Sequence, residues 1–178
     1  MAEGQPGFAI WLTGLPSSGK TTLAYALGHR LVKRGVLVQV LDSDGLRRVM
    51  TPRPTYSLEE RDCFYDLVTF LAGFLADYGI NVLIAATASR RAYRQAARER
   101  IKRFAEVYVA CPPQVCRARD PKGLWKRADT GEIATLPGVG ALYEPPDSPE
   151  VRVDTARLSM EEATNKIMSQ LDEQGFFG

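Results

Sequence analysis

Short apolar runs alternate along the chain with longer stretches whose apolar residues recur at helical spacing. Each short, continuous run predicts a buried strand. These runs cover residues 8–13, 36–41, 80–86, 105–110 and 151–154. The run 80–86 is apolar at nearly every position, which is typical of a parallel strand covered on both faces.

The stretches between these runs predict helices over residues 21–33, 57–78, 89–103 and 159–171, with a further short helix from Pro112. Ser57 with Glu60 three residues later forms a capping-box pattern at one helix start. Gly35 and Gly79 follow two of the helix ends. Strands that alternate with helices predict an α/β fold, with a five-stranded parallel sheet and helices on both faces.

Residues 120–149 have no clean periodicity and contain five of the eleven prolines. A structureless segment of this length inside a compact domain is usually functional. We therefore predict a lid over about residues 119–149 within a single domain that spans residues 1–178.

Composition narrows the function classes. The chain has 178 residues and a formal net charge of only +2, which argues against broad electrostatic capture of nucleic acid. No stretch reaches the roughly 20 apolar residues of a membrane span, and residues 1–6 lack a signal-type pattern. Three cysteines without metal-type spacing favour a reducing cytoplasm, and a lone His29 leaves little scope for a catalytic triad.

Between the first strand and the first helix lies the sequence GLPSSGKT, which fits the phosphate-binding pattern G-x-x-x-x-G-K-[ST]. The glycines let backbone N–H groups turn toward phosphate oxygens, and the helix start favours an anion. Lys20 would contact the β- and γ-phosphates, and Thr21 would bind Mg²⁺. We thus predict a P-loop NTPase-type fold that binds ATP and Mg²⁺ through Gly14, Leu15, Pro16, Ser17, Ser18, Gly19, Lys20, Thr21 and Thr22.

Two acids follow the second predicted strand, Asp42 and Asp44. Strand alternation would send both side chains to one side, at the edge of the sheet where ligands bind. A carboxylate there can orient and deprotonate an acceptor hydroxyl and hold Mg²⁺ through water. With Lys20 they form the predicted catalytic set of a small-molecule kinase. The alternative is an acidic turn that caps the helix starting near Leu46.

Cations follow on both sides of this predicted site. Arg47 and Arg61 would flank the acceptor pocket, so we expect an anionic acceptor. Further cations crowd the start of the lid: Arg117, Arg119, Lys122, Lys126 and Arg127. Solvated surface arginines and a basic surface loop remain the alternatives for these two groups.

Several motifs closely resemble those of the adenylylsulfate (APS) kinase family. They are RDPKGLW at 119–125, GEI at 131–133, YEPP at 143–146, LDSDGLR at 41–47 and the P-loop segment itself. The resemblance covers nearly the whole chain. It implies ATP-dependent phosphorylation of the 3′-hydroxyl of APS to give PAPS for sulfate activation, with Mg²⁺ and commonly a homodimer.

The resemblance also implies residue roles. Asp42 and Asp44 become the acceptor-side acids, with Asp44 at the hydroxyl and, through water, near Mg²⁺. Arg47 and Arg61 bind the phosphosulfate group of APS, and the lid lysine Lys122 lies near the phosphates. Arg117 joins the nucleotide-binding residues. Tyr56 and Leu136 match two phenylalanines that sandwich the APS adenine in the family.

The departures from the family pattern cluster on the acceptor side. Phe64 replaces an asparagine, Ala88 and its successors Ser89, Arg90 and Arg91 replace S-P-Y-R, and Ala134 replaces a lysine near Leu136. Either Phe64, Arg90 or Arg91 compensates in a divergent APS kinase, or the acceptor is another anionic or nucleotide-like molecule. A nucleotide-binding module without turnover and a polynucleotide-end kinase are further alternatives.

Overall fold

The structure is a computed structural model, and it describes residues 5–177. Most of the N-terminal segment that lacks a signal-type pattern therefore lies outside the described residues. Within that range no helix combines the length and the apolar character needed to cross a membrane.

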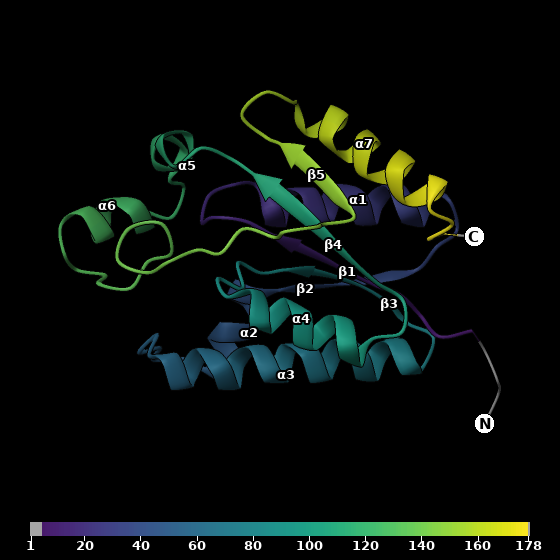
Figure 1. Cartoon of the computed structure of the whole chain (residues 1–178), viewed down its shortest axis with the longest axis horizontal. Helices are drawn as coiled ribbons and strands as arrows, with labels where there is room; N and C mark the ends of the chain where they lie inside the picture. The colour runs from purple at the N-terminus through teal and green to yellow at the C-terminus, as the bar shows by residue number, and fades with distance from the viewer. Residues whose placement is uncertain (1–4, 178) are drawn as a thin grey trace.

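Five parallel strands form one sheet: β1 (Ala9–Thr13), β2 (Val38–Asp42), β3 (Asn81–Ala85), β4 (Phe104–Ala110) and β5 (Val151–Asp154). Their order is β2-β3-β1-β4-β5, which confirms the predicted parallel sheet (Figure 1). β1 lies at the centre and all five of its residues are buried. β2 begins two residues later than predicted and ends on Asp42, so that side chain stands at the carboxyl edge of the sheet.

Helices cover both faces of this sheet, as predicted (Figure 1). One face packs on α1 (Lys20–Lys33) and α7 (Met160–Glu173), and the other on α3 (Leu58–Asp77) and α4 (Arg91–Arg100). The alternation of β1 divides the core accordingly. Ile10 and Leu12 join the α1 and α7 side chains, whereas Ala9 and Trp11 join those of α3 and α4.

A short helix, α2 (Ser43–Met50), leads from β2 toward α3. At the start of α3 the predicted capping box forms only in part. The Ser57 hydroxyl accepts a hydrogen bond from the Glu60 amide at 3.2 Å, but the Glu60 carboxylate binds Thr55 and Arg47 instead of the Ser57 amide. The Glu60 carboxylate therefore does not cap α3, and it faces the loop before that helix.

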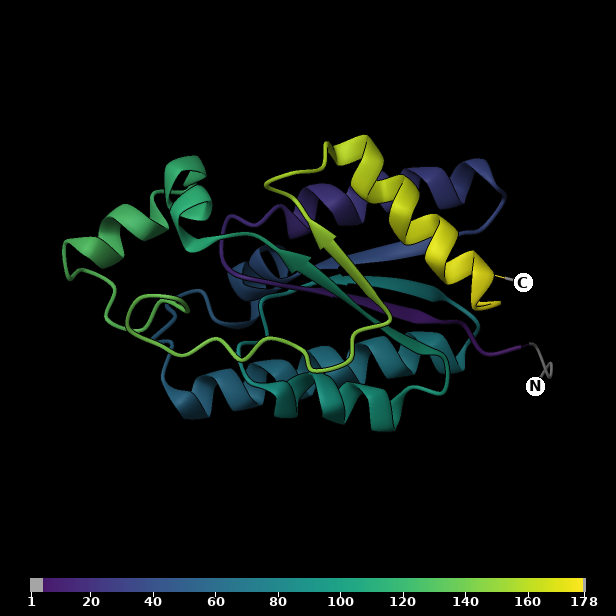
Figure 2. The same ribbon diagram turned by 45° about the horizontal axis from the view of Figure 1, so that its top comes forward.

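The lid contains more regular structure than the sequence suggested. After α5 (Pro113–Arg119) the chain forms α6 (Leu124–Asp129), inside the segment predicted to be irregular. Both helices lie at the end of the sheet toward which the strands point, and the chain then runs back along the molecule to β5 (Figures 1 and 2). The lid has its own small core around Trp125, Leu136 and Cys116.

Three hydrogen bonds join the lid to the rest of the fold. Trp125 Nε1 donates a hydrogen bond to the Pro16 carbonyl at 3.1 Å, which joins α6 to the P-loop. On the return, the Tyr143 hydroxyl lies 3.1 Å from Thr13 Oγ1, and the Glu144 carboxylate accepts from the Arg91 amide at 2.7 Å. The YEPP motif thus anchors the lid at the carboxyl edge of β1 and the start of α4.

Candidate active site

A cavity of about 1070 Å³ lies between the carboxyl edge of the sheet and the lid. Its wall is built by the P-loop, the start of α2, the loop before α3, the end of β3, the lid and the start of α7. Most predicted site residues line it: Pro16, Ser17, Gly19, Lys20, Thr21, Thr22, Asp44, Arg47, Tyr56, Arg61, Lys122 and Leu136. The fold therefore brings the predicted nucleotide and acceptor residues into one continuous space.

The P-loop has the backbone geometry of an anion cradle. Ser17 and Gly19 adopt positive φ values of 66° and 98°, and α1 starts at Lys20. Gly14 permits close packing, because a Cβ there would lie 2.4 Å from the Val109 carbonyl oxygen. Backbone N–H groups in such turns, followed by a helix N-terminus, suit a polyphosphate.

Lys20 is buried at the base of this cradle. Its Nζ donates a hydrogen bond to the Leu15 carbonyl at 2.8 Å, so the amine is folded onto the P-loop itself. Burial lowers the pKa of Lys20 from 10.5 to about 8, although Asp44 and other nearby groups oppose part of that effect. A polyphosphate in the cradle would supply the anion that this ammonium lacks.

Asp42 and Asp44 do not share one side of a strand, which corrects the prediction from strand alternation. Asp42 ends β2 and Asp44 lies in the first turn of α2. Asp42 accepts hydrogen bonds from the Thr21 hydroxyl at 2.9 Å and from the Gly45 amide at 3.2 Å, so it caps α2. The capping alternative therefore holds for Asp42, which is held behind the P-loop threonine and not among the lining residues.

Asp44 lies at the mouth of the cavity and forms an ion pair with Lys122 of the lid. About half of each side chain remains exposed to solvent. The pair closes the space between α2 and the lid, and both groups face the region between the P-loop and the acceptor side. The two acids are thus divided between the P-loop threonine and the lid lysine.

Arg47 and Arg61 line the acceptor side of the cavity. Arg47 pairs with Glu60 at 3.1 Å. Arg61 is buried and donates to the Tyr56 carbonyl at 3.0 Å and to the Thr135 carbonyl at 2.6 Å, so it joins α3 to the lid. Neither arginine is a solvated surface residue, so that alternative is wrong for both.

Tyr56 and Leu136 both line the cavity, as the predicted pair of apolar walls. Tyr56 has a positive φ of 55°, a conformation uncommon for a residue with a side chain. Its carbonyl is held by Arg61. Leu136 is buried in the lid core and presents an aliphatic surface rather than an aromatic face.

The structure does not bring Arg117, which was predicted to bind the nucleotide, into the wall of the cavity. It turns toward α6, where it pairs with Asp129 at 2.8 Å and covers the ring of Trp125, and it does not line the cavity. Arg119, two residues later on another side of α5, does line it, together with Arg127. The basic-surface alternative holds for Arg117 and Lys126, which do not face the cavity.

The residues expected to compensate on the acceptor side do not enter the cavity. Arg90 lies 3.7 Å from Asp62, and Arg91 pairs with Asp147 at 2.9 Å. Phe64 is buried in the core beneath α2. None of the three residues lines the cavity, so any compensation by them acts through other residues.

Some lining residues carried no signal in the sequence. Thr155 and Met160 line the cavity beside the P-loop, and Tyr65 and Thr87 line it on the acceptor side. Arg119 donates to the Thr155 carbonyl and, at 3.2 Å, to its hydroxyl. Arg119 belongs to the RDPKGLW motif and was among the predicted lid cations, whereas the other four belong to no motif.

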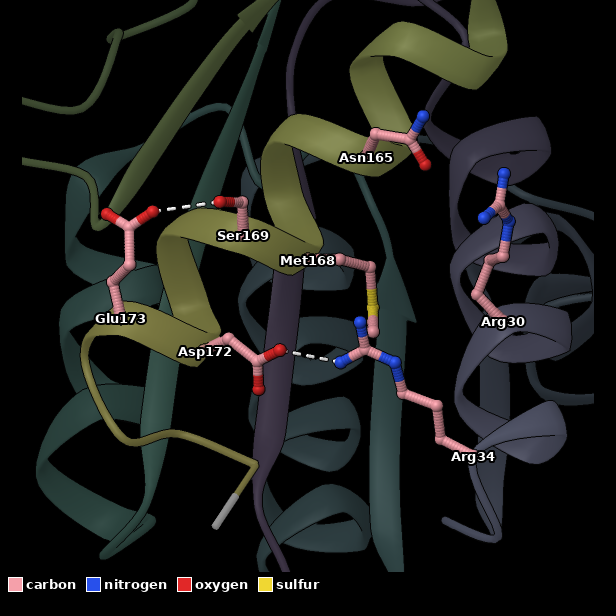
Figure 3. Close-up of a pocket in the computed structure, with 7 residues that line it drawn as sticks. All are labelled: Arg30, Arg34, Asn165, Met168, Ser169, Asp172 and Glu173. Atoms are coloured by element: carbon pink, nitrogen blue, oxygen red, sulfur yellow. Dashed lines mark hydrogen bonds and ion pairs between the residues drawn. The ribbon is translucent and has the colours of Figure 1, made fainter.

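A second, smaller cavity lies between α1 and α7, remote from the P-loop (Figure 3). Its volume is about 280 Å³, and its charged side chains already have partners, Arg30 through Glu161 outside the cavity. Arg34 pairs with Asp172 at 2.6 Å, and Ser169 donates to Glu173 at 2.8 Å. This cavity is a gap between two packed helices, and no predicted site residue lines it.

The oxygen atoms beside the P-loop fit Mg²⁺ better than a transition metal. The Thr21 hydroxyl and the Asp42 carboxylate are adjacent, and hard oxygen ligands suit Mg²⁺. Among residues 5–177 no group of three or more His, Cys, Asp or Glu side chains could cage a metal ion alone. Mg²⁺ is usually held by one or two protein oxygens together with substrate phosphates and water.

Comparisons with known proteins agree with this geometry. Residues 6–154 match the family described as Adenylylsulphate kinase. The chain is 40% identical to the adenylyl-sulfate kinase of Rippkaea orientalis over 97% of its own length and 95% of the relative. It is 38% identical to a probable adenylyl-sulfate kinase of Pyrococcus abyssi over 96% of its length and 98% of the relative.

A solved structure is similar over the same range. The Mycobacterium tuberculosis APS kinase in complex with AMPPNP and APS superposes with a TM-score of 0.88 and 32% identity. The match covers 95% of this chain and 99% of that protein.

Proposed function

The chain belongs to the adenylylsulphate kinase family, and from that membership we propose that it transfers the terminal phosphoryl group of ATP to the 3′-hydroxyl of APS. One observation supports this activity above the others: the cavity joins the P-loop to two arginines on its acceptor side. Its volume of about 1070 Å³ exceeds the roughly 300–1,000 Å³ usual for one small ligand, so it suits two substrates. The product is PAPS, the activated form of sulfate.

The residues divide the work of phosphoryl transfer. The P-loop amides and Lys20 hold the β- and γ-phosphates of ATP, with the ammonium stabilising negative charge on the transferring group. Arg47 and Arg61 bind the phosphosulfate group and so place the ribose of APS. Asp44 orients the 3′-hydroxyl and accepts its proton as the oxygen–phosphorus bond forms and the bond to the β-phosphate oxygen breaks.

Lys122 connects the acid to the lid. Lys122 neutralises Asp44 in the ion pair, and with both substrates bound its ammonium can move to the transferring phosphate. Release of Lys122 then leaves Asp44 free to accept the hydroxyl proton. The ion pair also joins the lid to the start of α2.

Mg²⁺ belongs to the proposal. The Thr21 hydroxyl and the Asp42 carboxylate, 2.9 Å apart, would hold it through direct or water-mediated contacts. When bound, Mg²⁺ neutralises the charge that develops on the phosphate oxygens. Asp42 therefore takes the metal side of the site, and Asp44 keeps the hydroxyl side.

Coupled ADP-release assays test the activity. We expect APS to stimulate ADP release strongly, and a panel of other nucleotides and sugar acids to do so weakly. The panel matters because Leu136 and Ala134 depart from the family on the acceptor side. If another acceptor stimulated ADP release and APS did not, that acceptor would be the substrate. ATP binding without any ADP release would indicate a nucleotide-binding module without turnover.

Replacement of Asp44 tests its role. Asp44→Asn keeps the size of the side chain but removes the proton acceptor, so kcat should fall about 100- to 10,000-fold while ATP binding persists. Asp77→Asn is a matched control, because Asp77 is also a half-exposed aspartate in an ion pair, here with Arg100, but lies at the far end of α3. A kcat of Asp44→Asn within a few-fold of the parent enzyme would contradict the assignment.

We also propose that the chain forms a homodimer and lies in the cytoplasm. A homodimer is supported by a row of exposed aromatic side chains along α3 and at its C-cap, formed by Phe70, Phe74 and Tyr78. A cytoplasmic location is supported by three cysteines without a disulfide. Sedimentation velocity at several protein concentrations tests the assembly.

A further inference from the structure

The guanidinium group of Arg47 lies over the ring of Phe64. The Arg47 Cζ atom is 3.8 Å from the Phe64 ring centroid and 5.1 Å from that of Tyr56. At its edge, Arg47 Nη1 donates to Glu60 Oε1 at 3.1 Å. The cation is therefore held from one face and one edge before any ligand arrives.

The Phe64 ring is itself fixed in place. It is 2% exposed and packs edge-on against Tyr65, with ring centroids 5.3 Å apart at 77°. The Tyr65 hydroxyl in turn accepts a hydrogen bond from the Ala88 amide at 3.0 Å. Because Phe64 cannot shift without disturbing this packing, it forms a rigid platform beneath the arginine.

Phe64 contacts Arg47 but does not line the cavity, whereas Arg47 does. We propose that Phe64 is a positioning residue, which sets the orientation in which Arg47 meets the anionic group of the acceptor. This inference rests on the proposed function. It means that the loss of the family's asparagine at this position is offset through Arg47 and not by a direct contact with the substrate.

The remaining hydrogen-bonding capacity of Arg47 fits this role. Within residues 5–177 its side chain makes one hydrogen bond, to Glu60, so most of its five N–H donors remain for a ligand. A guanidinium already held in one orientation loses little conformational entropy on binding a phosphate or sulfate group. An arginine without the platform would have to be ordered by the substrate.

The first test replaces the platform without changing the cavity wall. Phe64→Leu keeps an apolar side chain but removes the aromatic face. We expect KM for APS to rise about 3- to 10-fold, the range for the ordering of one long side chain, while kcat and KM for ATP stay within about twofold. Such a split is not produced by a general loss of stability.

Phe104→Leu is the matched control. Phe104 is also buried in the core on the α3 and α4 side, and Arg98 lies over its ring at 5.1 Å, but neither residue lines the cavity. We expect Phe104→Leu to lower the denaturation midpoint by an amount comparable to Phe64→Leu and to leave KM for APS unchanged. An equal rise of KM for APS in both variants would overturn the proposal.

A double-mutant comparison tests whether Phe64 acts through Arg47. In an Arg47→Ala background the platform supports nothing, so adding Phe64→Leu should change KM for APS by less than about twofold. A full additional rise would mean that Phe64 affects the acceptor by another route, and the assignment would be wrong.

A measurement without turnover keeps this inference separate from the proposed function. The Arg47 side chain can be followed by ¹⁵N NMR in the ligand-free protein. We expect restricted guanidinium motion in the parent and in Phe104→Leu, and faster motion in Phe64→Leu. Absence of APS-dependent turnover in the parent would contradict the proposed function. Unchanged Arg47 motion in Phe64→Leu would contradict the proposal that Phe64 positions Arg47.

Discussion

Asp42 and Asp44 are two residues apart, yet their neighbours give them different tasks. Asp42 is drawn to the Thr21 hydroxyl and to the start of α2, and Asp44 to a lysine 78 residues away in the lid. Residue type and spacing predicted two acids at the edge of the sheet. They could not predict that the two acids have different partners, because those partners depend on where β2 ends and on which side of the P-loop the lid lies.

Lys20 is the second residue whose surroundings decide its chemistry. Burial lowers its pKa to about 8, so the neutral amine becomes populated as the pH rises through that value. ATP restores the charged form, since its phosphates favour an ammonium. ATP binding should therefore be coupled to proton uptake near pH 8, and the affinity should be about tenfold lower at pH 9 than at pH 7.

Isothermal titration calorimetry at pH 8 in two buffers of different ionisation enthalpy checks the proton uptake. The Lys20→Met variant is the control. It should bind ATP more weakly, and between pH 7 and pH 9 its affinity for ATP should change only as far as the ionisation of ATP itself requires. Equal ATP affinity of the parent at pH 7 and pH 9 would contradict the lowered pKa of Lys20.

At the scale of elements, the lid closes through a tight turn over residues 134–141. The Leu136 carbonyl accepts from the amides of Val139, Gly140 and Ala141 at 3.0–3.1 Å. This turn brings Thr135 to Arg61 and Leu136 to the cavity wall. Gly140 makes it feasible, because a Cβ there would lie 1.8 Å from the Ala134 carbonyl oxygen.

We expect Gly140→Ala to open this turn. Relief of the backbone clash should lower the local free energy of opening by about 1–3 kcal/mol, which raises proteolytic cleavage within the lid about 5- to 150-fold. KM for APS should rise as well, because Arg61 loses its contact with Thr135. Limited proteolysis of the ligand-free protein, followed by mass spectrometry, measures the cleavage.

Gly131→Ala is the control within the same lid. Gly131 also has a positive φ, but nothing lies within 4 Å of an added Cβ, so this variant carries only the cost of the backbone conformation. That cost is about 1–2 kcal/mol for a residue with a side chain. If both variants left lid cleavage unchanged, the turn would not hold the lid.

At the scale of the whole molecule, one buried arginine joins segments that are distant in the sequence. Arg94 of α4 is 2% exposed and donates to Glu106 of β4 at 2.5 Å, to the Glu144 carbonyl at 2.6 Å and to the Ala88 carbonyl. It therefore ties α4 to the sheet, to the loop after β3 and to the return of the lid. In the sequence it is one of several arginines in the helix predicted over residues 89–103, and no motif sets it apart.

We expect Arg94→Met to destabilise the protein by about 3–5 kcal/mol, because the buried Glu106 would lose its hydrogen-bonded partner and keep only Arg98, at 3.9 Å. Arg100→Met on the same helix is the control. Arg100 pairs with Asp77 at 2.9 Å and both side chains are 44% exposed, so its loss should cost about 0–1 kcal/mol. Urea unfolding curves of the three proteins measure both effects, and similar losses would contradict the central role of Arg94.

Much of the fold could be predicted because its signals are local. Each strand is a run of a few apolar residues, and the P-loop is eight consecutive residues between a strand and a helix. The start of α7 was equally predictable from the sequence, and there Ser159 and Glu162 form a complete capping box. The lid helix α6 was missed because it is short and its burial comes from contacts with the P-loop and Leu136.

The candidate site was predictable only where a motif named its residues. Lys20, Asp44, Arg61 and Lys122 line the cavity as expected. Of the two arginines of α5, Arg119 lines it and Arg117 does not, because the helix turns Arg117 toward α6. Met160 and Thr155 had no motif and enter the wall only because α7 and β5 pack beside the P-loop.

By itself, the sequence determined the alternation of strands and helices, the phosphate cradle and the family to which the chain belongs, because periodicity and contiguous motifs encode them. The tertiary structure alone decided which charges meet. Arg61 reaches Thr135 across 74 positions of the chain, and Phe64 lies beneath Arg47 only because α3 packs against α2. Such contacts depend on how the elements are arranged in space, and no local pattern records that arrangement.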